Sequence, residues 1–140
     1  DEEIKELAEL LEKMQEENKD ATGEEVADKA FHMLIARATR NSAIEGIIDD
    51  LWNLRDKSEL THSMYKTVRT EGVKPSIHEH VAIYEGLRDR DPAAARLAMR
   101  THLSRVIDTM FKATEIEAVE EAKRKISRDR ERFTHLLKTS

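Results

Sequence analysis

The sequence contains no cysteine, two prolines, four glycines and few aromatic residues. The absence of cysteine excludes disulfides, cysteine-ligated zinc and thiol catalysis, and it fits a cytoplasmic protein. Because β-rich folds need many turns, so little glycine and proline favours long helices. No apolar run approaches the roughly 18 residues of a membrane-spanning helix, and no signal peptide is recognisable, so we expect no membrane partner.

Charge, in contrast, is abundant, with 24 lysines and arginines against 29 aspartates and glutamates and a net charge of −5. This balance argues against a domain that binds nucleic acid through bulk electrostatics. With 140 residues, 39% of them hydrophobic, the chain is long enough for one domain with a core of its own. We predict a single domain over residues 1–140. The chain starts at Asp1 rather than at methionine, which indicates a fragment of a longer protein.

Apolar residues recur at helical spacing along the chain and predict an all-α fold, an antiparallel helical bundle of about six helices. The first helix is expected over Glu2–Asn18, and residues 58–73 read as a broken helix. Helix starts are expected where Ser or Thr precedes Glu by three residues, and where Asp precedes Pro. These starts are Thr22–Glu25, Ser42–Glu45, Ser76–Glu79 and Asp91-Pro92. Thr114 offers one more cap, where the long helix after Pro92 is expected to break or bend.

Four polar residues lie on the faces that these helices should turn inward. Asp28 and His32 are four residues apart and therefore share one face of the second helix. His80 and His102 fall on the apolar stripes of two other helices, whereas His78 lies off the stripe and is expected at the surface. A buried carboxylate or imidazole is costly unless it is paired, hydrogen-bonded or bound to a metal.

Each of these residues, taken alone, has a simpler explanation as a hydrogen-bonded core residue, and Asp28 with His32 could be an ordinary polar pair. The contribution of three separate helices is what favours a metal site. Imidazole nitrogens with one carboxylate suit zinc, nickel or manganese, whereas calcium prefers oxygen ligands alone. From spacing alone, a metal site and a set of satisfied core histidines remain equally open.

Two further features carry charge. Arg55 continues the apolar stripe of the third helix, Ile44, Ile47, Ile48 and Leu51. The favoured interpretation is that its side chain extends to the surface; the alternative is that it points into a cavity and binds a carboxylate through two hydrogen bonds. The basic stretch from Lys123 to Arg132 is interrupted by acidic residues and reads as a solvated helix face.

One stretch of the sequence resembles the FCD domain. It consists of Asp28-Lys29-Ala30-Phe31-His32, followed by Ile35-Ala36-Arg37-Ala38-Thr39-Arg40-Asn41. That domain is the effector-binding C-terminal part of FadR-subfamily GntR-type transcription regulators. The resemblance covers about residues 1–112, and the step from His80 to His102 suits it. It continues through His80-Val81-Ala82-Ile83-Tyr84-Glu85-Gly86-Leu87, then Asp91, Ala94, Ala95, and Met99 to Leu103.

The resemblance implies a dimeric helical bundle that holds a divalent metal, zinc first and nickel or manganese as alternatives, through Asp28, His32, His80 and His102. It implies a small carboxylate effector beside the metal. The stretch 51–55 and the tail beyond residue 116 are most similar to the branch that senses hexuronates and related sugar acids. The family's winged helix-turn-helix domain, which would contact DNA, and its first bundle helix are both absent from this sequence. A partner chain could supply the missing helix.

We therefore expect a sensor and not an enzyme. The metal would offer open positions to an effector oxygen, Arg55 would meet the effector's other end, and binding would shift helix packing at the dimer interface. The alternative is a metal-dependent hydrolase or lyase, which needs a general base beside the metal. Glu79 and Glu85 are the candidates, and neither is expected on the histidine face. A third reading is a purely structural bundle.

Overall fold

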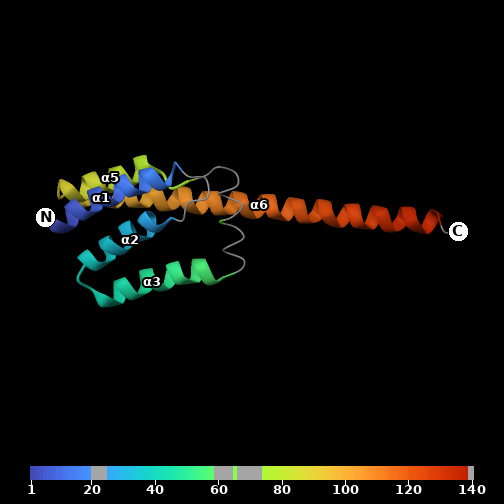
Figure 1. The fold of residues 1–140 in the computed structure, drawn as a ribbon, viewed down its shortest axis with the longest axis horizontal. Coiled ribbons are helices and arrows are strands. Elements are labelled where there is room, and N and C mark those ends of the chain that lie inside the picture. The colour runs from blue at the N-terminus through green and yellow to red at the C-terminus, as the bar shows by residue number, and fades with distance from the viewer. Residues whose placement is uncertain (20–24, 59–64, 66–73, 139–140) are drawn as a thin grey trace.

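The computed structural model describes residues 1–19, 25–58, 65 and 74–138 as an all-α fold (Figure 1). No strand occurs in these ranges, so the predicted fold class is confirmed, and no described helix is long and apolar enough to cross a membrane. The helices with bounds among the described residues are α1 (Glu2–Glu17), α2 (Val26–Ala38), α3 (Ser42–Lys57), α5 (Ile77–Arg88) and α6 (Pro92–Lys138). The expected cap at Thr22 and the expected broken helix over 58–73 fall almost entirely outside the described residues.

The core lies where α1, α2 and α5 meet, with the first part of α6 against α5 (Figure 1). Phe31 of α2 and Ile83 of α5 are almost completely buried there. The apolar stripe that α1 turns to them consists of Leu7, Leu10, Leu11 and Met14. Burial of these side chains is the main favourable term in folding, and it fixes α2 and α5, which carry three of the four predicted ligands.

Side chains cap the starts of α3, α5 and α6, with one correction to the sequence prediction. Ser76 accepts a hydrogen bond from the Glu79 backbone nitrogen (3.4 Å), as predicted for α5. Asp91 accepts from the backbone nitrogens of Ala93 (2.9 Å) and Ala94 (3.0 Å) at the start of α6, also as predicted. The expected cap at Ser42 is wrong, because Asn41 takes that role and accepts from the backbone nitrogens of residues 43 and 44.

The predicted break near Thr114 is also wrong, since α6 continues unbroken from Pro92 to Lys138. The Thr114 hydroxyl donates to the Met110 carbonyl oxygen (2.9 Å) of the preceding turn, a bond that threonine forms inside helices. The sequence around it contains no glycine or proline and is rich in alanine, glutamate and lysine, which are strong helix formers. Two expected helices are therefore one.

Helix α3 behaves differently from the other described helices. Within the described residues α3 contacts α2 and no other helix. Its predicted stripe has the right spacing but is largely uncovered, with Ile47 60% and Leu51 57% exposed. In Figure 1, α3 lies on the far side of α2 from α1. Side chains of both α3 and α6 line a pocket, which is described below.

The close approach of α5 and α6 depends on Gly86. A Cβ atom at this buried position would lie 2.5 Å from the Ala95 backbone nitrogen and 2.7 Å from its Cα. Contacts that short are excluded, so glycine allows the two backbones to meet here. Gly86 follows His80 by under two turns and Ala95 precedes His102 by about two turns. The crossing therefore sets the separation of these two histidines.

Candidate metal centre

Three imidazoles from three helices converge at one point inside the bundle. His32 comes from α2, His80 from α5 and His102 from α6, and one ring nitrogen of each lies within 4.8 Å of the others. His80 is completely buried and His102 is 4% exposed. His78 is exposed and His80 is buried, so the prediction from the apolar stripe that His80 and not His78 lies inside is confirmed.

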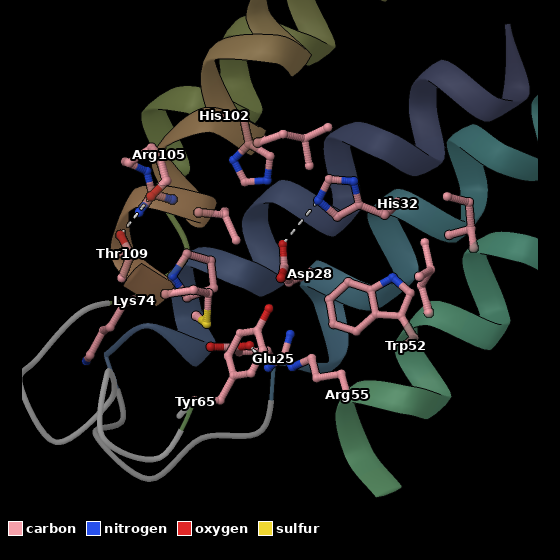
Figure 2. A pocket seen from close by; sticks show the side chains of 16 residues that line it. Glu25, Asp28, His32, Trp52, Arg55, Tyr65, Lys74, His102, Arg105 and Thr109 are labelled. Atoms are coloured by element: carbon pink, nitrogen blue, oxygen red, sulfur yellow. Dashed lines mark hydrogen bonds and ion pairs between the residues drawn. The ribbon is translucent and has the colours of Figure 1, made fainter. Parts of the chain in front are cut away.

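The fourth predicted residue, Asp28, lies in the same place. Its Oδ1 atom is 2.8 Å from His80 Nε2 and 3.6 Å from His32 Nε2, and the two Nε2 atoms are 3.4 Å apart. Figure 2 shows the Asp28 carboxylate directed toward His32. Asp28 lies in the first turn of α2. In the same turn, the Ala27 backbone nitrogen donates a hydrogen bond to the Glu17 carboxylate of α1 at 3.1 Å. This contact from α1 fixes the helix start that carries Asp28.

Hydrogen bonds on the outer side of two imidazoles determine which nitrogens face inward. His80 Nδ1 lies 2.8 Å from the Ser76 carbonyl oxygen, and His102 Nδ1 lies 2.9 Å from Glu79 Oε2. Both partners can only accept, so each Nδ1 carries the proton and each neutral ring keeps a lone pair on Nε2. An outer acceptor that holds the ring and its tautomer in this way is the usual arrangement around a metal-binding histidine.

The Asp28 carboxylate makes the cluster chemically incomplete. Its Oδ1 atom is buried and has no hydrogen-bond donor within the described part of the chain. A neutral His80 turns its Nε2 lone pair toward this oxygen, which places two acceptors 2.8 Å apart. A cation must separate them, either a second proton on His80 or a metal ion. Three nitrogen donors and one carboxylate oxygen fit a divalent metal such as zinc, nickel or manganese.

The carboxyl group of Asp28 is suited to stay ionised. Burial by itself would raise the pKa of Asp28, but hydrogen bonds and charge interactions with His32 and His80, which arise when these imidazoles carry a second proton, outweigh burial and hold that pKa well below its usual range. Burial lowers the pKa of His102, and the charges of the other two imidazoles act in the same direction against the Glu79 hydrogen bond. Both shifts favour the deprotonated groups that a metal ion requires.

Sequence reasoning missed the role of Glu79. Its expected position, off the histidine face of α5, is correct, but its carboxylate reaches across to α6. There Oε2 accepts from His102 Nδ1 (2.9 Å) and Oε1 accepts from Arg105 Nε (2.5 Å). Burial would raise the pKa of Glu79, but the Arg105 and His102 hydrogen bonds outweigh it and lower the pKa. A sequence signal for this role was Arg105, a cation one turn beyond His102 on the same helix that could attract a carboxylate to this place.

Substitution of Glu79 by glutamine should weaken metal binding without removing a ligand. The neutral amide is a weaker acceptor for His102 and no longer pairs with Arg105, so we expect roughly a 10–100-fold loss of affinity, the range for outer partners of metal-binding histidines. Competition with a chromophoric chelator measures this loss. The matched control is Glu85→Gln, an exposed glutamate of the same helix, which should leave affinity unchanged. Equal affinity in both variants would show that Glu79 does not orient His102.

The cluster opens into a cavity of about 320 Å³ (Figure 2). Asp28, His32 and His102 form part of its lining. The other walls come mainly from α3 and α6, with Ile48, Leu51, Trp52, Leu103, Val106 and Met110. A cavity of this size is at the lower end of the range for small-molecule sites. The open space between α3 and α6 is therefore a pocket that leads to the four polar residues.

Arg55 lines this cavity, so the favoured interpretation of a surface arginine is wrong. Its side chain is 16% exposed and forms an ion pair with Glu25. The guanidinium carbon lies 3.9 Å from the centre of the Tyr65 ring and 4.7 Å from that of Trp52. Aromatic rings attract cations in this geometry and hold the group at the cavity wall. Lys74 and Arg105, which sequence reasoning did not select, also line the cavity.

Comparison with known proteins gives matches over most of the chain. The family model described as FCD domain matches residues 1–105. The Exu regulon transcriptional regulator of Escherichia coli is 31% identical over 87 residues, which are 62% of this chain and 34% of that protein. The Uxu operon transcriptional regulator of the same species is 28% identical over 103 residues, 68% of this chain and 37% of that protein.

A Haemophilus influenzae protein named Uxu operon regulator is 26% identical over 92 residues, 65% of this chain and 35% of that protein. The chain thus spans about a third of the length of the curated relatives it matches. No solved structure matches the chain significantly. The residues matched to the family model include Asp28 and all three clustered histidines.

Proposed function

Since the chain belongs to the FCD domain family, we propose that it is the metal-dependent, small-molecule sensing domain of a transcription regulator. The observation that carries the proposal is the composition of the cavity's inner end. There two inward lone pairs, on His80 and His102, and a third imidazole, His32, surround a buried carboxylate oxygen that has no donor among the described residues. The relatives named above are transcriptional regulators, which supports the same function for the longer protein.

The proposed metal ligands are Asp28, His32, His80 and His102. Zinc is our first choice, with nickel and manganese as alternatives, because nitrogen-rich sites with one carboxylate suit all three ions. When bound, the metal would supply an open coordination position for a carboxylate or hydroxyl oxygen of the effector. The chain's own contribution is to orient the imidazoles through the Ser76 carbonyl and Glu79.

The proposed effector is a small carboxylate, with hexuronates and related sugar acids first. Three cationic side chains in the cavity lining, Arg55, Lys74 and Arg105, support an anionic ligand. Arg55 already holds a carboxylate, that of Glu25. An effector carboxylate would exchange with Glu25 at the same guanidinium, whose planar fork suits a carboxylate.

This exchange would connect the effector to the metal site. Glu25 immediately precedes α2, and Asp28 lies in the first turn of that helix. An effector carboxylate that replaces Glu25 in the ion pair with Arg55 would therefore act on the start of α2, which carries the proposed metal ligand Asp28. In a homodimer of the longer protein, a resulting shift of helix packing would change how the DNA-binding domains sit on their half-sites.

A metal-dependent hydrolase or lyase would need a general base beside the metal. The two glutamates nearest the cluster are already engaged, Glu79 with His102 and Arg105, and Glu25 with Arg55. The curated relatives are regulators. We therefore keep the sensor as the proposal and the enzyme as an outcome of the test below.

Thermal unfolding of the metal-loaded chain with hexuronates and other small carboxylates tests the proposal. A ligand at 100 times its dissociation constant should stabilise the chain by about 2.7 kcal/mol and be recovered unchanged. Arg55→Gln should reduce this stabilisation, whereas Arg37→Gln, at an exposed arginine, should retain it. Chemical conversion of the ligand would indicate the enzyme instead. No stabilisation by any carboxylate would contradict the sensor.

A further inference from the structure

The second half of α6 extends past the rest of the molecule (Figure 1). Among the described helices, α5 is the one whose backbone runs close to that of α6, and residues 114–138, here named the projecting segment, continue beyond it. From residue 114 to residue 134 every side chain except Glu117 is exposed. Because most helices in proteins owe their stability to packing of one face, a helix of this length without a neighbour indicates an interaction surface.

The exposed side chains of the projecting segment form a stripe. Val119, Ile126 and Phe133 recur every seven residues and are 53%, 60% and 71% exposed. Ala122 lies between the first two on the same side. A seven-residue repeat keeps apolar side chains on one face of a helix and is the repeat of left-handed coiled coils. The stripe therefore fits the side of another helix.

Charge along the same segment is divided into two blocks of equal length. Residues 113–122 contain four glutamates and no basic residue, a net charge of −4. Residues 123–132 contain six basic and two acidic residues, a net charge of +4. The solvated basic face expected from the sequence is thus one half of a pattern whose other half has the opposite sign.

These blocks select the partner and its direction. Two copies of the segment side by side in parallel would set glutamates against glutamates and basic residues against basic residues. Antiparallel copies would set each acidic block against the basic block of the other copy, with a two-fold axis near Ala122 and Lys123. Such an arrangement is self-complementary, as a closed two-fold interface requires.

We propose that the projecting segment pairs antiparallel with the same segment of a second copy of this chain. The apolar stripe supplies the attraction, and the charge blocks set the direction, since each exposed ion pair contributes only about 0–1 kcal/mol. The segment lies beyond the residues matched to the FCD domain, 1–105, and outside the cavity lining. The pairing is therefore independent of the metal and of the effector.

The absence of cysteine makes the test direct, because one introduced cysteine carries the only spin label. Glu117→Cys, Arg124→Cys and Glu131→Cys occupy equivalent positions of the seven-residue repeat, away from the stripe. Pulsed dipolar spectroscopy on the full chain measures the distance between labels of two copies. Antiparallel pairing predicts the shortest distance at position 124. The other two positions should show an additional axial separation of roughly 15–25 Å, from a rise of about 1.5 Å per residue.

Equally short distances at all three positions would show parallel pairing and overturn the proposal. Monomeric chain, or a dimer without a minimum at position 124, would overturn it as well, including a dimer in which the segment fills the space between α3 and α6 of the other copy. Ile126→Asp should abolish the short distance at position 124. Ser127→Asp, the same charge change at the adjacent exposed residue, should retain it.

Discussion

The variant His80→Ala is expected to lose tight binding of divalent metal, with affinity reduced by more than the roughly 10–100-fold expected for an outer partner. His80 is completely buried and its Nε2 atom lies 2.8 Å from Asp28 Oδ1 and 3.4 Å from His32 Nε2. His80 therefore lies against two other members of the cluster. Its removal takes away one nitrogen donor and leaves a gap beside the other two. Isothermal titration with zinc measures the loss.

The matched control is His78→Ala on the same helix. His78 is exposed and lies off the cluster, so this variant should bind zinc with the affinity of the parent chain. Removal of the buried His80 ring also costs stability, about 2–5 kcal/mol by analogy with other buried large side chains. Circular dichroism must therefore show that the variant is folded. Equal zinc affinity in a folded His80→Ala chain would contradict the proposed site.

A second large effect is expected for Asp28→Asn, and the size of the stability change that it causes without metal separates two explanations of the cluster. If Asp28 serves a metal, the amide removes the anionic ligand and zinc affinity falls sharply. In the metal-free chain, however, the amide can donate to the His80 Nε2 lone pair and satisfy both groups. We therefore expect the free energy of unfolding without metal to change by less than about 1 kcal/mol.

A structural ion pair between Asp28 and a protonated His80 predicts that Asp28→Asn strongly destabilises the metal-free chain. Loss of one partner of a buried pair leaves the other charge uncompensated and costs about 3–5 kcal/mol. Chemical denaturation in the presence of a chelator measures the difference. Asp50→Asn, at an exposed aspartate of α3, is the control for the loss of one negative charge. A large destabilisation of metal-free Asp28→Asn alone would favour the ion pair over the metal.

Helical periodicity shows which residues share a face of one helix, but not which residues of two helices meet. This difference decides how much of the site could be predicted. The spacing of Asp28 and His32 requires a common face of one helix, and the apolar stripe separates His80 from His78. Both inferences concern a single helix, and the structure places these residues as expected. Glu79 was missed because its contact with His102 depends on how α5 crosses α6. That crossing is set by the close approach at Gly86, which no periodicity reveals.

The fold shows the same division between local and long-range information. The class, the α1 stripe and the caps at Ser76 and Asp91 follow from local patterns. The predicted break at Thr114 failed because threonine can cap a helix or bond within one, and its neighbours decide which. Arg55 shows the limit most clearly. Its stripe position was known, but Glu25 and Tyr65, which hold it at the cavity, come from segments distant in sequence.

The central claim is that three imidazoles and one carboxylate of this chain bind one divalent metal ion. X-ray absorption at the zinc edge, on chain loaded with one equivalent of zinc, tests it most directly. The account predicts three imidazole nitrogens per zinc at about 2.0–2.1 Å together with oxygen, from His32, His80, His102 and Asp28. A spectrum with oxygen neighbours and no more than one imidazole, as zinc on an exposed histidine such as His78 would give, would contradict it.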